Sequence, residues 1–292
     1  MAKLNRGFNQ VALNGSVGAV TYVYRKGTTI AKQKVPPKVK AKQTPRLMAT
    51  RMRWANLVRM WQALNSVGWH PSFKSVEGLQ SDYNAFVKRN FSRGPVYLTK
   101  DVVLQGGGVV GPAQVTEGEL ATIGGSMVEG VFTSTIAMGA MTIGASSTLR
   151  TFSQTILEEN PDWMNGDQLT IVILRQGGTN AAPVIVPEIH ELTIDDQDDS
   201  SLLGDLIGVN TLAVTGGKLV LSGTVVGGAC FVHSRETSNG TIVSTEVLAI
   251  SNSSVLNAYQ GGSAFERAVN SYGGFATSQY LTPNISQDLA AD

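Results

Sequence analysis

The chain has 292 residues, of which 42% are hydrophobic and 15% are charged, and its formal net charge is +1. This hydrophobic content argues against wholesale disorder, and no uninterrupted apolar run approaches the ~18 residues that a membrane helix needs. The single cysteine, Cys230, excludes an internal disulfide. The first residues lack the apolar core of a secretion signal, so we expect a protein that is assembled in a cytoplasm.

The near-zero total charge hides two oppositely charged parts of the sequence. Residues 1–100 contain 18 Lys and Arg and two acids, a net charge of +16. Residues 101–292 contain 5 Lys and Arg and 20 acids, a net charge of −15. Such asymmetry favours a polyanionic partner, or head-to-tail contacts between copies of the chain. Charge alone leaves both possibilities open.

The first predicted element is a β-hairpin over residues 9–35. Residues 20–25 alternate between two faces, as a half-buried strand does, and Gly27 suits the turn that follows. Beyond Pro36-Pro37, a lysine ladder of Lys38, Lys40 and Lys42 occupies every second position. This segment is either a charged linker or an arm that lies along an acidic surface, of a nucleic acid or of a neighbouring subunit.

Two helices are predicted next. Thr44-Pro45 combines a capping hydroxyl with a proline at the first helical position, so a helix should run from there to about residue 64. A second helix is predicted over residues 81–90. The first helix should bury one stripe of apolar side chains, made of Leu47, Trp54, Val58 and Trp61.

Beyond Pro95 the composition changes to short β-branched runs separated by glycines, which predicts an antiparallel sandwich or barrel. We therefore expect an α+β protein with three parts. They are a basic hairpin and helical domain (1–94), an acidic β domain (95–262), and a tail with a short helix near Phe265–Val269 (263–292). The candidate strands are residues 96–104, 119–123, 131–137, 168–175, 184–194, 212–214, 218–226, 229–233 and 241–250.

No motif in the sequence predicts catalysis. Residues 106–111 match GxGxxG formally, but Pro112 follows where the fingerprint needs a helix. The three histidines are scattered, and no serine or cysteine has the local sequence of an activated nucleophile. We expect no enzymatic activity, no cofactor, no metal ion and no small-molecule substrate.

The charges instead predict two complementary contact surfaces. The acidic run at 195–199 lacks the glycine and distal glutamate of an EF-hand, so we interpret it as a loop that faces solvent or a basic neighbour. Its carboxylates are Asp195, Asp196, Asp198 and Asp199. The basic surface, for a neighbouring subunit or a nucleic acid, comprises Arg25, Lys26, Lys32, Lys34, Lys38, Lys40, Lys42, Arg46 and Arg53.

Several short motifs together carry a resemblance. They are Gly15–Gly18, Tyr24-Arg25-Lys26-Gly27, Thr44-Pro45, Arg51 with Trp54, residues 81–86, Trp163 with Gly166-Asp167-Gln168, and residues 250–253. The chain resembles a family of uncharacterised proteins encoded by Bacteroidota and by their phages, including crAss-like phages. Residues 106–147 have no counterpart in that family. The resemblance implies a β-sandwich of immunoglobulin or fibronectin type and a structural role in the neck, collar or tail of a virion.

The sequence therefore predicts a virion structural subunit that assembles into a ring or tube, in contact with copies of itself and other virion proteins. Two alternatives remain. One is a nucleic-acid-binding protein that uses the basic N-terminal domain, and the other is a genome-lining capsid protein. We expect no membrane partner, while DNA remains a possible one.

Overall fold

The computed structural model describes residues 2–4, 15–17, 20–25, 28–33, 45–73, 81–198, 200–208 and 211–272. The chain forms two compact units. The first, here called the N-terminal unit, comprises Met1–Thr44 with Glu77–Leu79, and the second, the body, comprises Pro45–Val76 with Gln80–Asp292. The predicted boundary between residues 94 and 95 therefore differs from the division in the structure, which falls before the first helix.

The N-terminal unit contains one antiparallel sheet with the strand order β1-β4-β3-β2. Strands β3 (Val20–Arg25) and β4 (Thr28–Gln33) pair as the predicted hairpin, with Arg25 opposite Thr28. The hairpin is thus confirmed, and its connecting residues 26 and 27 lie outside the described residues. Strands β1 (Ala2–Leu4) and β2 (Gly15–Val17) extend it on both sides.

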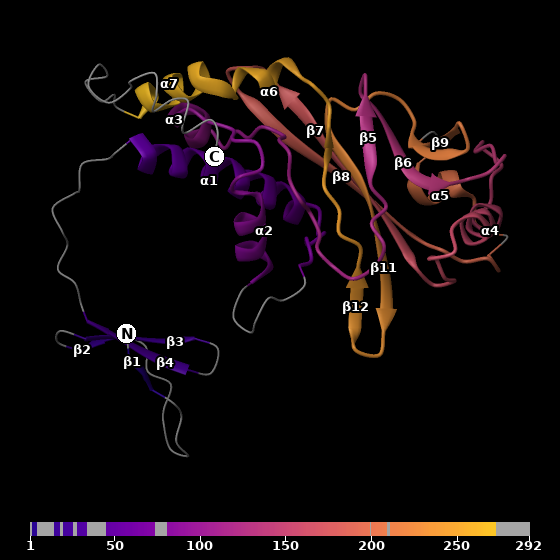
Figure 1. Cartoon of the computed structure of the whole chain (residues 1–292), viewed down its shortest axis with the longest axis horizontal. Coiled ribbons are helices and arrows are strands. Elements are labelled where there is room, and N and C mark those ends of the chain that lie inside the picture. Colours follow the sequence, from indigo (N-terminus) through magenta and orange to yellow (C-terminus); the bar gives the residue numbers. More distant parts are fainter. Residues whose placement is uncertain are drawn as a thin grey trace. The chain divides into compact units, whose positions relative to one another are not determined.

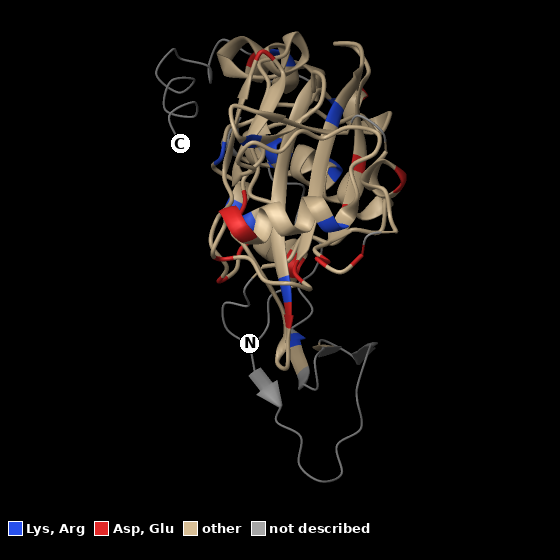
Figure 2. Ribbon diagram, turned by 90° about the vertical axis from the view of Figure 1, so that its right-hand side faces the viewer, with Lys and Arg blue, Asp and Glu red and all other residues tan. Residues whose placement is uncertain are grey.

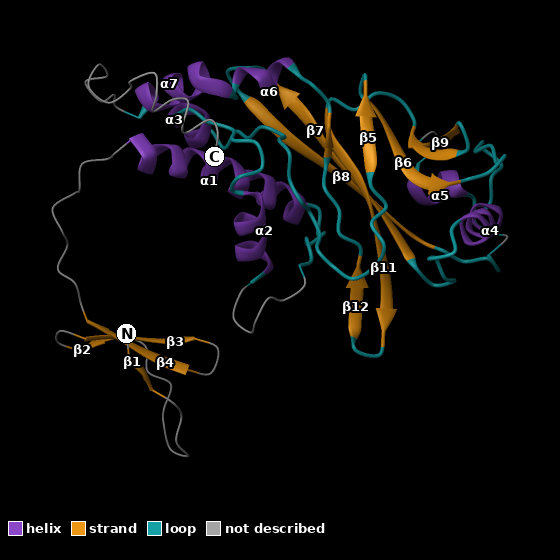
Figure 3. Ribbon diagram, in the orientation of Figure 1, coloured by secondary structure: helices purple, strands orange, loops and turns teal. Residues whose placement is uncertain are grey.

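The body is built on two antiparallel sheets (Figures 1 and 3). The first has the order β5-β6-β10-β9, and the second has the order β12-β11-β7-β8 with β13 paired to β11. Their bounds are β5 Gly125–Val128, β6 Val131–Ala137, β7 Gln168–Gly178, β8 Pro183–Thr193, β9 Leu212–Thr215, β10 Lys218–Leu221, β11 Gly227–Thr237, β12 Gly240–Val243 and β13 Ala249–Ile250.

Strand β7 is buried on both faces, which explains its continuous apolar sequence. Leu169 and Ile171 face the core between the two sheets, together with Phe132 of β6 and Phe231 of β11. Those two phenylalanine rings meet edge to face at 4.9 Å. The side chains of odd-numbered residues of β7 thus pack between the two sheets, and those of even-numbered residues point to the opposite face of the sheet.

Helices cover that opposite face. The helical end of the body, as we call it, comprises α1 (Pro45–Ser66), α2 (Asp82–Asn90), α3 (Lys100–Leu104), α6 (Ser254–Ala258) and α7 (Gly261–Ser271), as Figure 1 shows. Leu57 of α1 and Phe86 of α2 share one core with Val172 of β7 and Cys230 of β11. This shared core is why α1 and α2 belong to the same unit as the sheets. An α+β fold is therefore observed.

The two predicted helices are confirmed, but the buried face of α1 was predicted only in part, because Trp61 packs against the core whereas Leu47 and Trp54 are exposed. Trp54 is 48% exposed and Leu47 is 40% exposed, whereas Met52 and Leu64 are fully buried. The buried side chains of α1 are Ala49, Met52, Arg53, Asn56, Leu57, Met60 and Leu64. They form a stripe at spacings of three and four that contains polar residues, so apolar periodicity alone did not find it.

Two predicted strands are absent from the described part of the chain. Residues 96–104 form an extended segment and then α3, and residues 119–123 make only an isolated bridge, between Leu120 and Ser244. Thr99 is the N-cap residue of α3, and Asp101 lies in its first turn, a helix start that the β-branched run obscured. The sequence prediction also missed α4 (Leu149–Glu159) and α5 (Leu203–Ile207), which lie at the other end of the sheets.

The glycine-rich segment 106–111 serves packing. A Cβ at Gly108 would lie 2.9 Å from Arg59 Cβ and from Ile185 Cδ1, and the Gly108 amide donates to the carbonyl of Pro183. The absence of a side chain lets this segment pass between α1 and the start of β8. No helix follows it, so the structure offers no pyrophosphate site there.

Candidate interaction site at the acidic end of the body

The predicted basic surface is only partly within the described residues. Arg25 ends β3, Lys32 is exposed on β4, and Arg46 lies in the first turn of α1. Lys26, Lys34, Lys38, Lys40 and Lys42 lie outside the described residues.

Arg53 does not belong to that surface, contrary to the sequence prediction. Its side chain is 8% exposed, and its Nη2 donates to the hydroxyl of Tyr97 at 3.2 Å. The guanidinium carbon lies 5.7 Å from the ring centroid of Tyr97 and 5.9 Å from that of Phe91, within cation–π range. The buried face of α1 carries this side chain, so Arg53 contributes to the core of the helical end and not to an exposed basic surface.

The predicted acidic loop follows β8, and the structure fixes it in place. Asp198 Oδ1 accepts hydrogen bonds from the amides of Ser200 and Ser201 and from the Ser200 hydroxyl, at 2.8–3.0 Å. The Ser201 and Ser200 hydrogen bonds lower the pKa of Asp198 to about 2. The loop therefore keeps this negative charge at any physiological pH. Asp199 lies outside the described residues.

Two neighbouring segments add further carboxylates. The Asp195 amide donates to Ser153 Oγ of α4 at 3.0 Å, and the Asp196 amide donates to Asn165 Oδ1 at 3.2 Å. The acidic loop is thus held against α4 and against the turn that follows it, and both carry exposed acids. Figure 2 shows red segments at one end of α4 and in the loops beside it. We name this surface the acidic end, and it comprises Glu158, Glu159, Asp162, Asp195, Asp196 and Asp198.

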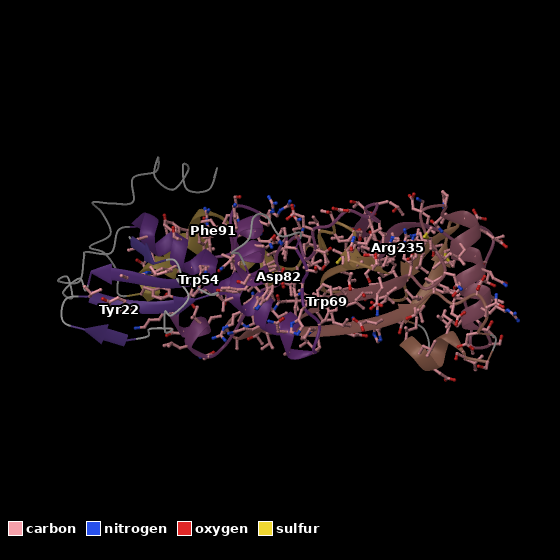
Figure 4. All side chains as sticks on the ribbon, turned by 90° about the horizontal axis from the view of Figure 1, so that it is seen from below. Tyr22, Trp54, Trp69, Asp82, Phe91 and Arg235 are labelled. Carbon is pink, nitrogen blue, oxygen red and sulfur yellow. The ribbon has the colours of Figure 1, made fainter. Side chains whose placement is uncertain are left out.

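A buried polar cluster lies behind the acidic end. Asp167, at the start of β7, is 1% exposed and accepts from His233 Nε2 at 2.7 Å. Arg235 donates from Nε and Nη2 to the two Asp167 oxygens, each at 2.7 Å, and from Nη2 also to the carbonyl of Asp162. The Trp163 ring stacks on His233 with a centroid distance of 3.9 Å and an interplanar angle of 10°. These contacts tie the turn 160–167 to β11. Figure 4 shows Arg235 of β11 far from Trp54 of α1.

The cluster sets the charge state of its members. Burial opposes the ionised form of Asp167, but the hydrogen bonds from Arg235, Met164 and His233 outweigh it, so the pKa of Asp167 is lowered. Burial lowers the pKa of His233 even though Asp167 favours its protonated form. Near neutral pH, Asp167 is therefore ionised and His233 is neutral.

An aspartate that holds a histidine also occurs in catalytic sites, but the two serine hydroxyls next to this pair in the described strands are already hydrogen-bonded. Ser234 Oγ donates to Gln168 Oε1, and Ser244 Oγ accepts from the His233 amide, so both neighbouring hydroxyls serve structure. Cys230 is fully buried, and burial raises its pKa well above the ordinary value, which makes it an inert thiol. Among the described residues no group of three His, Cys, Asp or Glu could hold a metal ion.

Sequence reasoning found the acidic loop, and it singled out Trp163 and Asp167 only as parts of a motif, so it connected neither to His233. His233 is 66 residues from Asp167, and only the pairing of β7 with β11 brings them together. Two features of the sequence could have indicated this cluster. One is the closely spaced pair Trp163 and Asp167, and the other is His233 within an apolar run.

Comparisons with protein-family models, with curated proteins and with solved structures give no match for this chain. In the described part of the chain, no helix combines the length and the apolar character needed to cross a membrane.

Proposed function

We propose that this protein is a self-assembling structural subunit, in which the N-terminal unit of one copy binds the acidic end of the next. The observation that carries this proposal is the division of charge between the two units. The N-terminal unit contains nine Lys and Arg and one acid, Glu77, a net of +8 (9 − 1). The body contains 14 Lys and Arg and 21 acids, a net of −7 (14 − 21).

The location of the acids supports a specific contact over a diffuse one. Six carboxylates lie on three adjacent segments at the acidic end, and hydrogen bonds hold its loops in fixed positions. A preformed surface loses little conformational entropy when it binds a partner. A head-to-tail contact of this kind uses two different surfaces, so it closes into a ring or continues as a tube.

The setting that we propose is a virion, as part of a neck, collar or tail. This rests on the resemblance to the Bacteroidota and phage family described above. The finer fold is also a proposal, namely a sandwich of immunoglobulin or fibronectin type. It is supported by two antiparallel sheets that share one core.

The test is the mass of the full-length protein in solution, measured by sedimentation velocity between 50 mM and 500 mM NaCl. We expect oligomers at low salt that dissociate as salt rises, because the Debye length falls below 10 Å above 0.1 M. Lys38→Glu with Lys40→Glu should give monomers at all salt concentrations. The matched control is Lys88→Glu with Lys100→Glu, two exposed lysines of the body, and it should assemble normally.

A charge swap distinguishes this contact from other roles of the lysines. Combining Lys38→Glu and Lys40→Glu with Glu158→Lys and Asp196→Lys should restore oligomers. Wild-type protein that is monomeric at every salt concentration would contradict the proposal. If such a monomer binds DNA with a steep salt dependence, the nucleic-acid function is favoured instead, because each neutralised phosphate contributes about 0.9 to that slope.

A further inference from the structure

An open cavity of about 310 Å³ lies beside the buried polar cluster, where the end of α4 meets the two sheets. Its lining residues include two exposed acids, Glu159 and Asp162. Trp163 and His233 also line it. The cavity is therefore part of the acidic end, and it has a polar inner wall.

His233 lines this cavity and has one ring nitrogen that is not used by the cluster. Its ring is 1% exposed, and its Nε2 bonds to Asp167. An ionised carboxylate only accepts hydrogen bonds, so the hydrogen of the neutral ring lies on Nε2, and Nδ1 carries a lone pair. Nδ1 has no hydrogen-bond partner among the residues that the structure describes. The stacked Trp163 and the Asp167 hydrogen bond together fix the ring in this orientation.

The remaining walls define the shape of a suitable ligand. Ile123 and Ile136 contribute apolar surface, while Glu159 and Asp162 supply negative charge. A fitting group donates hydrogen bonds, carries positive charge and has an apolar stem. A lysine side chain has all three properties, since its ammonium has three donors and its four methylenes pack on apolar surface.

We propose that this cavity receives the ammonium group of one lysine from residues 28–44 of a second copy, with His233 Nδ1 as one acceptor. The inference rests on the assembly proposed above and names its anchoring contact. Residues 28–44 contain five lysines and no arginine or acid, which matches a site for a compact cation. The five are Lys32, Lys34, Lys38, Lys40 and Lys42.

The first experiment replaces each of these five lysines singly by glutamine in the full-length chain and measures the dissociation constant of the oligomer. An inserted lysine makes charge-assisted hydrogen bonds, so one substitution should weaken assembly about 10- to 100-fold. The other four should each weaken it much less. Five equal effects would indicate diffuse attraction and would overturn the cavity contact.

The second experiment changes the cavity itself. Glu159→Gln with Asp162→Asn removes the two charges at the cavity while keeping side-chain shape, and it should weaken assembly at least about tenfold. The matched control, Glu158→Gln with Asp196→Asn, removes the same charge from the acidic end outside the cavity lining, and it should have a smaller effect. Equal effects of the two pairs would overturn the inference.

The third variant isolates His233. His233→Gln places an amide donor where Nε2 stood, so the bond to Asp167 is kept while the Nδ1 acceptor is lost. We expect weaker assembly, with a melting temperature lowered by only a few degrees because the stacking on Trp163 is lost. If this variant and the cavity pair assemble like wild type while Lys38→Glu with Lys40→Glu dissociates, the cavity contact fails and the proposed assembly stands. If that lysine variant assembles normally, both fail.

Discussion

The two ends of the body bury polar side chains in different ways. At the helical end, Asn56 Nδ2 donates to the Val109 carbonyl and Asn56 Oδ1 accepts from the Val109 amide, each at 2.9 Å. At the acidic end, Asp167 is surrounded by donors, and His233, which bonds it through Nε2, is one of the residues that line a cavity. Buried polar side chains that hydrogen-bond to backbone amides and carbonyls, as Asn56 does, stabilise the fold. A buried acceptor without a partner among the described residues, such as His233 Nδ1, can accept a hydrogen bond from a ligand.

The largest expected effect tests whether the acidic end is also needed for stability. Asp167→Ala removes the partner of both Arg235 and His233. Breaking a buried charged pair from one side costs about 3–5 kcal/mol, so the free energy of unfolding in urea should fall by that amount. The control is Asp205→Ala at an α5 position where no such cluster exists, which should change stability far less. A loss below about 1 kcal/mol for Asp167→Ala would place this cluster outside the cooperative core.

The second prediction applies the same reasoning to the helical end. Asn56→Ala leaves the buried Val109 amide and carbonyl without partners, and each lost partner costs about 1–3 kcal/mol, so we expect a loss of about 2–4 kcal/mol in total. Asn257→Ala, which removes a hydrogen bond between two exposed asparagines, is the control and should have little effect. Oligomer formation by Asn56→Ala protein that remains folded should be normal. Loss of assembly in such protein would argue that the helical end takes part in the contact.

The extent of sequence prediction differs between the two ends for a physical reason. Strand β7 was predicted because burial on both faces requires a continuous apolar run, which is visible in one dimension. Helix α4 was missed although Leu149, Phe152 and Ile156 recur at helical spacing, because serine and threonine residues interrupt them. The acidic loop was predicted from its residues alone, whereas its juxtaposition with α4 depends on contacts that no local pattern encodes.

The third prediction uses pH to separate the two ends. The folded pKa of His233 lies below its ordinary value of 6.5, so the unfolded state binds more protons in the window just below pH 6.5. Stability should therefore fall as the pH decreases through that window, by at most about 1.4 kcal/mol per pH unit for one proton. Asp167, Arg235 and Asp162 are the charged groups that act on this ring.

The measurement is urea unfolding of wild type and of His233→Gln between pH 5.0 and 7.5. The difference in unfolding free energy between them should be constant above pH 6.5 and should change below it. Glu246, whose pKa burial raises, contributes with the opposite sign in both proteins, so it cancels in the comparison. A difference that does not depend on pH would show that His233 titrates equally in the folded and unfolded states.

The smallest expected effect concerns two tryptophans of α1 that the sequence placed on one buried stripe. Trp54 is 48% exposed, so Trp54→Ala should change the unfolding free energy by less than about 0.5 kcal/mol. Trp61 lies 5.6 Å from the Tyr83 ring and 5.5 Å from the Phe86 ring, and its loss should cost about 2–3 kcal/mol. Equal costs would mean that Trp54 is covered in solution. Because sedimentation velocity at low salt detects self-association, a larger loss for Trp54 under those conditions alone would place a second subunit contact at the helical end.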